Sequence, residues 1–384
     1  MIDARRTVRS SCRMCHGVCQ VLVHLEGDRV VRVTGDPDSP TSRGYICAKG
    51  RASPELLYHP DRLTHPLRRV GARGEGRWER VSWDDALDEI AARILSIRDE
   101  SGAEFVGLCQ GTGRPYIEFT QRFIYAFGSP NFVAPAHVCY LSRWFASLLT
   151  IGRLPVADVY GFGGEDPACF VMWGCNITEY GAADGMCGGL VRQAVDRAEK
   201  LIVVDPRRTS LAERADHFLQ LRPGTEGALA LAMLNTVIAE DLIDQGFVEG
   251  HTSGFPELVD HVRSFTPEWA APITRVAAAD IRAAARTYAT TLPGCIQWGS
   301  ATDMSAASYQ TARSLVILRA LVGNLDRPGG DVLWVPPEGV RQKSTFVNPD
   351  QRGEQFLPSQ KRSVSAGRFT LDLVAHPRLS GSRS

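Results

Sequence analysis

Four cysteines near the amino terminus constrain this chain more than any other feature of its sequence. Cys12, Cys15 and Cys19 lie within eight residues, and Cys47 follows after a gap of 27, in the pattern C-x2-C-x3-C-x27-C. Three thiols this close together converge only where a tight loop wraps around a bound group, and a fourth thiol completes a tetrahedral set. Four thiolates suit a [4Fe–4S] cluster or a structural zinc ion.

The spacing leaves three bound groups in competition. A structural zinc site usually takes two C-x2-C pairs, and here the distant part of the pattern offers one cysteine only. The run from Cys12 to His16 also matches the C-x-x-C-H signature of covalent haem attachment, but that interpretation leaves Cys19 and Cys47 unexplained. The pattern therefore favours a cluster, with zinc as the main alternative.

Length and charge limit the classes of partner. A chain of 384 residues predicts two or three domains, and 43 basic residues balance 43 acidic ones, so no global field favours nucleic acid. No apolar run approaches the length of a membrane span. No apolar segment follows the paired Arg5 and Arg6, so we expect no export signal and a cytoplasmic location.

The first 150 residues predict two regions. Residues 20–36 alternate apolar and polar side chains around a Glu26-Gly27-Asp28 turn and predict a hairpin, in a small β domain over residues 1–62 that needs its metal for stability. Residues 63–150 begin an α/β domain. There Ser82 is expected to cap a helix, residues 105–109 to form a buried strand, and residues 111–114 a Gly-rich loop. The helix is expected to pack through one apolar stripe, which consists of Leu87, Ile90, Ile94 and Ile97.

Residues 151–335 have the pattern of a doubly wound α/β domain. Strands are predicted at 168–173, 201–204 and 295–299, with helices through Leu190 and Ala194, across 226–290, and through 312–321. Asp205 follows the second of these strands, where an acidic side chain can accept hydrogen bonds from ribose hydroxyls. Residues 336–384 have little periodicity and are expected to form an irregular tail.

The cysteine region carries a family resemblance. Residues 12–19, 26–37 and 42–50, the last ending Cys47-Ala48-Lys49-Gly50, resemble the amino-terminal segment of the molybdopterin oxidoreductases of the dimethyl sulphoxide reductase superfamily. The resemblance implies that Cys12, Cys15, Cys19 and Cys47 ligate a [4Fe–4S] cluster. It also implies that Lys49 lies between the cluster and a pterin. It extends over about residues 10–340.

Later motifs in the same order strengthen this resemblance. They are similar to the family's W-G-x-N, D-P-R-x-T, R-P-G-T-D and G-N-x-x-R-P-G-G turns, with Glu226 in place of the usual aspartate of the third. The resemblance implies a bis-molybdopterin guanine dinucleotide cofactor. The residues implied to bind it are Trp173, Gly174, Asn176, Asp205, Arg207, Thr209, Arg222, Gly224, Thr225 and Asn324.

Cys139 stands where the family carries its protein ligand to molybdenum or tungsten. A soft thiolate suits such a metal, although a lone cysteine, judged by spacing alone, is more often a buried free thiol. The resemblance therefore makes Cys139 the candidate ligand.

The resemblance implies redox chemistry on a small-molecule substrate. Electrons would pass by Lys49 to the cluster, and then to an electron-transfer subunit with further clusters. Tyr140 stands where formate dehydrogenases have a histidine, and residues 301–305 contain none, so formate oxidation is disfavoured. Two alternatives stay open. One is a non-redox hydratase like acetylene hydratase, for which His16 replaces the expected acidic residue and is a candidate proton donor. The other is a non-catalytic cluster-carrying subunit.

The predicted fold class is therefore α/β. A small antiparallel iron–sulphur domain is expected to precede doubly wound domains. The resemblance implies a final β-barrel domain for which we expect this chain to have no room.

Overall fold

The computed structural model describes residues 5–15, 17–111, 117–135, 139–161, 164–180, 188–333 and 335. Its contacts divide the chain into two compact units. Unit 1 is Met1–Tyr58 with Val138–Val335, and unit 2 is His59–His137 with Pro336–Ser384. The domain boundaries expected from the sequence, after residues 62, 150 and 335, stay predictions.

Unit 1 begins with a three-stranded antiparallel sheet, β1 (Arg5–Ser11), β2 (Gln20–Glu26) and β3 (Arg29–Gly35), in that order. The predicted hairpin of β2 and β3 is confirmed, and Gly27 takes the positive φ of 59° that its turn requires. The buried apolar cluster of this sheet consists of Val21, Val33 and Ile46. Two short helices follow, α1 (Ala48–Arg51) and α2 (Ser53–Leu57).

The main sheet of unit 1 is parallel and has the strand order β11-β10-β9-β12. Its strands are β9 (Cys169–Trp173), β10 (Lys200–Val204), β11 (His217–Leu219) and β12 (Gly294–Trp298). Every residue of β9 and β12 is buried, which is typical of a parallel sheet covered on both faces. The doubly wound α/β prediction is confirmed.

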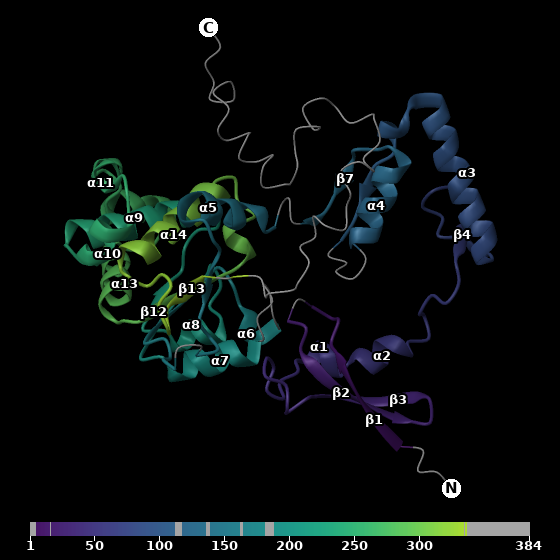
Figure 1. Ribbon diagram of the computed structural model, residues 1–384, viewed down its shortest axis with the longest axis horizontal. Helices are drawn as coiled ribbons and strands as arrows, with labels where there is room; N and C mark the ends of the chain where they lie inside the picture. Colours follow the sequence, from purple (N-terminus) through teal and green to yellow (C-terminus); the bar gives the residue numbers. More distant parts are fainter. Residues whose placement is uncertain are drawn as a thin grey trace. The chain divides into compact units, whose positions relative to one another are not determined.

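Helices cover both faces of this sheet (Figure 1). Phe170 and Met172 of β9 pack with α7 (Gly188–Arg197) and α8 (Ser210–Arg214). Val171 and Trp173 face the other way because side chains alternate along a strand. They pack with α9 (Glu226–Ala239), α13 (Ala278–Thr290) and α14 (Ser308–Leu321).

Shorter elements complete unit 1. Helices α5 (Leu141–Ile151), α10 (Gln245–His251), α11 (Phe255–Val262) and α12 (Pro267–Thr274) lie among the helices of the α9 side. Strand β8 (Pro155–Ala157) pairs antiparallel with β13 (Asp331–Leu333). The four-residue helix α6 (Ile177–Tyr180) follows β9, and the 3-10 helix η3 (Ser300–Thr302) follows β12.

A buried ion pair anchors β12 to its neighbours. Arg319 of α14 and Asp331 of β13 lie 3.0 Å apart, and both side chains are fully buried. The Arg319 guanidinium lies 4.0 Å from the ring centroid of Trp298 and donates to the carbonyl of Ile296 at 2.8 Å. The pair therefore joins a helix, a strand and the end of β12.

Unit 2 contains the antiparallel pair β4 (Leu67–Arg69) and β5 (Trp78–Arg80), then α3 (Trp83–Ser101) and the 3-10 helix η1 (Ala103–Phe105). Strand β6 (Leu108–Cys109) pairs parallel with β7 (Phe132–Val133), and α4 (Ile117–Phe127) lies between them in sequence. The predicted cap of α3 is confirmed, because the Ser82 hydroxyl accepts a hydrogen bond from the Asp85 amide.

Two expectations for unit 2 are wrong in part. Leu87 and Ile90 of the predicted apolar stripe are 57% and 58% exposed, whereas Ile94 and Ile97 are half-buried. Periodicity identifies the apolar face of a helix but not whether a partner covers it. Residues 105–109 do not form one buried strand, because Phe105 ends η1 and is 69% exposed, and only Leu108–Cys109 pair. Residues 112–114 of the predicted Gly-rich loop lie outside the described residues.

None of the helices in the part of the chain that the structure describes has both the length and the apolar character that a membrane crossing requires.

The pKa of Asp331 predicts a pH dependence of stability. Burial raises this pKa from 3.8 to about 6, and Arg319 opposes the shift. A carboxyl whose folded pKa is raised contributes stability that is full below the unfolded pKa and is lost as pH rises through the folded one. We expect the free energy of unfolding of the wild type to fall between pH 4 and pH 7 by about 2 kcal/mol relative to Asp331→Asn. Urea unfolding across this range measures it, and parallel curves for the two proteins would contradict it.

Candidate cluster and cofactor site

The structure brings together Lys49 and the cysteines of the amino-terminal region. Residues 12–19 and 42–50 are called the cysteine loop below. The amide of Cys12 donates to the carbonyl of Cys19 at 2.8 Å, and the Cys12 thiol interacts electrostatically with Cys15, Cys47 and Lys49. All four predicted cluster cysteines are free of disulfide bonds. His16, the candidate proton donor, lies outside the described residues.

The donor chemistry of this loop fits a cluster. Among the described residues, no three His, Cys, Asp or Glu side chains converge as they would around a single metal ion. A [4Fe–4S] cluster takes four cysteine ligands, one on each iron atom, which is the donor set of this loop. Burial raises the pKa of the Cys12 thiol, and the nearby Lys49 charge opposes that shift.

The cysteine loop packs directly against the parallel-sheet part of unit 1. The Tyr45 ring occupies the space beside Gly188 and Gly189 at the start of α7, where an added Cβ on Gly189 would lie 2.4 Å from Tyr45 Cδ2. Cys19 is buried in the apolar cluster that contains Ile177 and Leu190. The loop therefore lies beside the turn that follows β9.

That turn is at the carboxyl edge of the sheet, between the neighbouring strands β9 and β12. The chain leaves β9 for β10, which lies on the side of β9 away from β12. Ligands of open α/β sheets bind at such a switch point. Gly174, at a φ of 60°, donates its amide to the carbonyl of Val204, and the Gly299 amide donates to the carbonyl of Trp173. An added Cβ on Gly174 would lie 2.7 Å from Ala301 Cβ, so the turns after β9 and β12 meet closely.

The ends of β10 and β11 contribute further polar groups to this edge. Asp205 is buried and accepts hydrogen bonds from the amide and Nε of Arg207, at 2.8 and 3.3 Å. Thr209 caps α8 by accepting from the Ala212 amide. After β11, Arg222 is exposed, and the Thr225 hydroxyl donates to its carbonyl at 2.6 Å. Thr225 holds the N-cap position of α9, but its side chain makes no capping hydrogen bond there.

The residue that departs from the family pattern is also buried. Glu226, the first residue of α9, is 5% exposed, and burial raises its pKa. Hydrogen bonds from its own amide and that of Gly224 oppose this shift. The larger side chain is thus held beside the Arg222–Thr225 turn.

Nine of the ten predicted nucleotide contacts therefore lie at one edge of the sheet, and Asn324 does not. The Asn324 side chain is fully buried, and its Oδ1 accepts from the amide of Gly294 at 2.9 Å. Gly294 is the first residue of β12, so Asn324 lies at the amino edge of the sheet. This hydrogen bond fixes the position of the first residue of β12.

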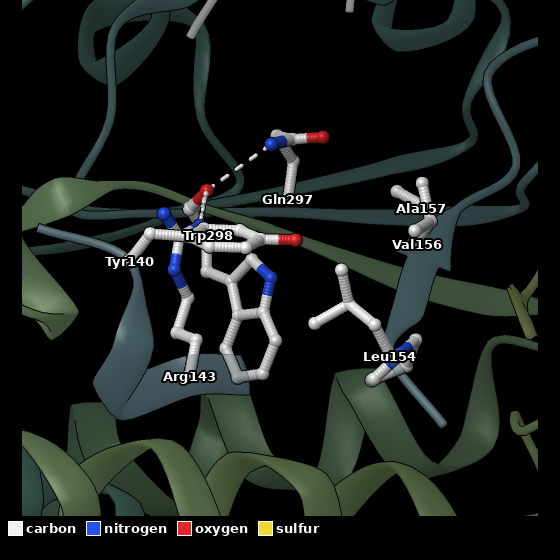
Figure 2. A pocket seen from close by; sticks show the side chains of 8 residues that line it. Tyr140, Arg143, Leu154, Val156, Ala157, Gln297 and Trp298 are labelled. Atoms are coloured by element: carbon white, nitrogen blue, oxygen red, sulfur yellow. Dashed lines mark hydrogen bonds between the residues drawn. The ribbon is translucent and has the colours of Figure 1, made fainter. Parts of the chain in front are cut away.

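Cys139, the predicted metal ligand, is half-buried in the turn that leads into α5. Arg143, the third residue of α5, has its Nε 2.7 Å from Asp303 Oδ2, with both side chains buried. Figure 2 shows Arg143 and Gln297 both directed at the carbonyl oxygen of Trp298, each at 3.1 Å, beside a pocket of about 40 Å³. The turn of Cys139 is thus adjacent to the carboxyl end of β12.

Sequence reasoning missed Asp303 and its pairing with Arg143. Both lie in stretches that the sequence marked, one after Cys139 and one in the polar loop after the β12 strand. Because 160 residues separate them, no local pattern links one to the other.

A much larger groove of about 1320 Å³ lies elsewhere in unit 1. Residues of α5, α9, α10, α11 and α14 line it, and it contains none of the predicted site residues. Size alone therefore does not identify the candidate site.

Comparison with known proteins assigns the class to which this arrangement belongs. Residues 5–59 match the family model described as the molybdopterin oxidoreductase Fe4S4 domain, and residues 62–377 match the molybdopterin oxidoreductase model. The chain belongs to the molybdopterin oxidoreductases with an amino-terminal Fe4S4 domain. Within them it is a member of the dimethyl sulphoxide reductase family.

The relatives differ in their named activities. Acetylene hydratase from Syntrophotalea acetylenica is 33% identical over 96% of this chain and 50% of its own length. The molybdopterin-containing subunit of thiosulfate reductase from Salmonella typhimurium is 31% identical over 93% and 45%. The solved acetylene hydratase from Pelobacter acetylenicus has a TM-score of 0.76 at 33% identity, over 92% of this chain and 48% of that one. The chain spans about half the length of these relatives.

The Tyr45 contact predicts a specific sensitivity at Gly189. Gly189→Ala places a Cβ against the Tyr45 ring, and overpacking of this kind costs about 1–3 kcal/mol. We expect lower thermal stability and less bound iron, with Tyr45→Ala restoring part of both in the double variant.

Gly250→Ala is the matched control for this prediction, because Gly250 lies in α10 with no heavy atom within 4 Å of an added Cβ. It should leave the iron content unchanged. Equal iron loss in the two alanine variants would contradict the proposed packing role of Tyr45.

Proposed function

We propose that this chain is a bis-molybdopterin guanine dinucleotide-dependent oxidoreductase that passes electrons between a small-molecule substrate and a [4Fe–4S] cluster. Cys12, Cys15, Cys19 and Cys47 would bind the cluster, and Cys139 would ligate molybdenum or tungsten. The observation that carries the proposal is the packing of the cysteine loop against the start of α7, where Tyr45 meets Gly189.

The chemistry of the cysteine loop supports electron transfer. Lys49 follows Cys47 by two residues, and its positive charge acts on the Cys12 thiol. A fixed positive charge beside a cluster stabilises its reduced, more negative state. Lys49 would therefore favour arrival of an electron at the cluster.

The carboxyl edge of the sheet supports dinucleotide binding. The buried carboxylate of Asp205 is oriented by Arg207 and can accept hydrogen bonds from ribose hydroxyls. The exposed guanidinium groups of Arg207 and Arg222 can pair with phosphate oxygens. When bound, the pterin-held metal would supply the centre at which substrate exchanges an oxygen atom, hydride or sulphur equivalent.

A non-redox hydratase is the second candidate, because a relative named acetylene hydratase is 33% identical over 96% of this chain. The relative named as a thiosulfate reductase subunit favours the redox alternative and a separate electron-transfer subunit as partner.

Metal analysis and two assays test these alternatives on anaerobically purified protein. Iron with molybdenum or tungsten and a pterin supports an enzyme, and iron alone indicates a cluster-carrying subunit. Oxidation of reduced viologen with thiosulfate, or with another oxygen-atom or sulphur-atom donor as the electron acceptor, supports the oxidoreductase. Conversion of acetylene to acetaldehyde without net electron transfer supports the hydratase and overturns the primary proposal.

Cluster ligation predicts a selective loss of iron. Cys47→Ser should remove most of the bound iron and the brown absorbance, because a hydroxyl is a poor ligand for this cluster. Cys109→Ser is the control, since Cys109 is an exposed cysteine of unit 2 outside the proposed ligand set. Iron retained in Cys47→Ser at the level of Cys109→Ser would argue against ligation by Cys47.

Nucleotide binding at the carboxyl edge predicts that substitutions of Asp205 and Asp216, which lie near opposite ends of β10, change the bound nucleotide content differently. Asp205→Ala should lower the guanine nucleotide released by acid hydrolysis several-fold, with iron content maintained. Asp216→Ala is matched, because Asp216 pairs with Lys200 at the start of β10. Equal nucleotide content in the two variants would remove Asp205 from the binding site.

A further inference from the structure

We propose that Asp303 is a positioning residue for Cys139, acting as a helix cap supplied from a distant loop. The inference rests on the proposed function only in taking Cys139 as the metal ligand. Its physical content is that one carboxylate, beyond the end of β12, sets where α5 begins and hence how the Cys139 turn is held.

The first part of the evidence is the capping geometry. Helix α5 starts at Leu141, two residues after Cys139, and Tyr140 at its N-cap makes no side-chain capping bond. The amides of a first helical turn have no partner within the helix. Asp303 Oδ1 accepts the amide of Arg143, the third residue of α5, at 3.2 Å. A carboxylate here satisfies an orphan donor and is favoured by the positive end of the helix dipole.

The second part is the ion pair made by the other carboxylate oxygen. Asp303 Oδ2 lies 2.7 Å from Arg143 Nε, with side-chain exposures of 0% and 2%. Arg143 Nη1 donates to the carbonyl of Trp298 at 3.1 Å, and its guanidinium lies 5.7 Å from the Trp298 ring centroid. The backbone and the side chain of Arg143 are therefore both held by one loop.

A third contact joins the same two segments. The hydroxyls of Ser142 in α5 and Ser308, the first residue of α14, are 2.8 Å apart. Two consecutive residues of α5, Ser142 and Arg143, thus contact the chain that follows β12. Contacts at successive positions restrict rotation of the helix start as well as its distance, which a single contact would not do.

Burial alone does not explain this arrangement as a stabilising device. Replacing a buried ion pair with apolar side chains is often neutral or stabilising, whereas removing one partner is strongly destabilising. The Arg143–Asp303 pair is distinguished by its location, because Arg143 follows Cys139 by four residues. The equally buried Arg319–Asp331 pair contacts the same Trp298 ring but joins α14 to β13.

These two pairs supply a matched experiment on the full chain. Asp303→Asn leaves one carbonyl oxygen to serve two donors of Arg143, so the Cys139 turn should loosen. We expect the molybdenum or tungsten retained per iron to fall several-fold. In metal-depleted protein we expect the alkylation rate of Cys139 by iodoacetamide, followed by mass spectrometry, to rise several-fold relative to Cys109.

Asp331→Asn is the control, since it breaks a comparable pair away from Cys139. It should leave metal retention and Cys139 alkylation unchanged, whatever its effect on the unfolding temperature. Arg143→Lys keeps the amide that Asp303 caps and should retain more metal than Asp303→Asn. Equal effects of Asp303→Asn and Asp331→Asn on Cys139 would overturn the inference.

The two readouts separate this inference from the proposed function. Wild-type protein without molybdenum or tungsten would contradict the function, while the alkylation comparison would still test positioning. Metal present, with Cys139 alkylation and metal retention unchanged in Asp303→Asn, would leave the function intact and overturn the positioning role.

Discussion

The parallel pairing of four strands is the constraint on which the rest of unit 1 depends. Because β9 and β12 are parallel and every residue of both is buried, their carboxyl ends meet at one edge of the sheet. The cysteine loop, the Asp205 turn and the Cys139 turn all approach this edge. The parallel pairing of the strands thus brings the proposed cluster, nucleotide and metal-ligand segments to one edge of the sheet.

Trp298, the last residue of β12, is where this edge is held most firmly. One buried arginine lies against its ring from α14, and another reaches it from α5. Each arginine is paired with a buried aspartate, so four charged groups are desolvated around one indole. Such an arrangement contributes little net stability compared with apolar packing, but it allows few alternative geometries. The two ion pairs therefore connect α5, α14, β13 and the loop after β12 around the end of one strand.

The sequence predicted the fold of unit 1 well and that of unit 2 less well. Apolar runs such as 168–173 and 201–204 identified buried parallel strands because such strands need no alternation of polar residues. In unit 2 the same reasoning failed at Leu87, Ile90 and Phe105, which are exposed. An apolar pattern reports what a segment would bury given a partner, and the described part of unit 2 supplies none at these positions. Of the ten predicted nucleotide contacts, Asn324 lies at the opposite edge of the sheet from the other nine.

By itself, the sequence determined the four-thiol pattern, the hairpin and the order of strands and turns, because these follow from spacing along the chain and from local backbone preference. Only the tertiary structure decided that Tyr45 fills the space beside Gly189, that Asn324 holds the start of β12, and that Asp303 caps the helix after Cys139. Each of these contacts joins residues that are far apart in the chain. Their meeting depends on how helices and loops pack around the sheet, and no local pattern records that packing.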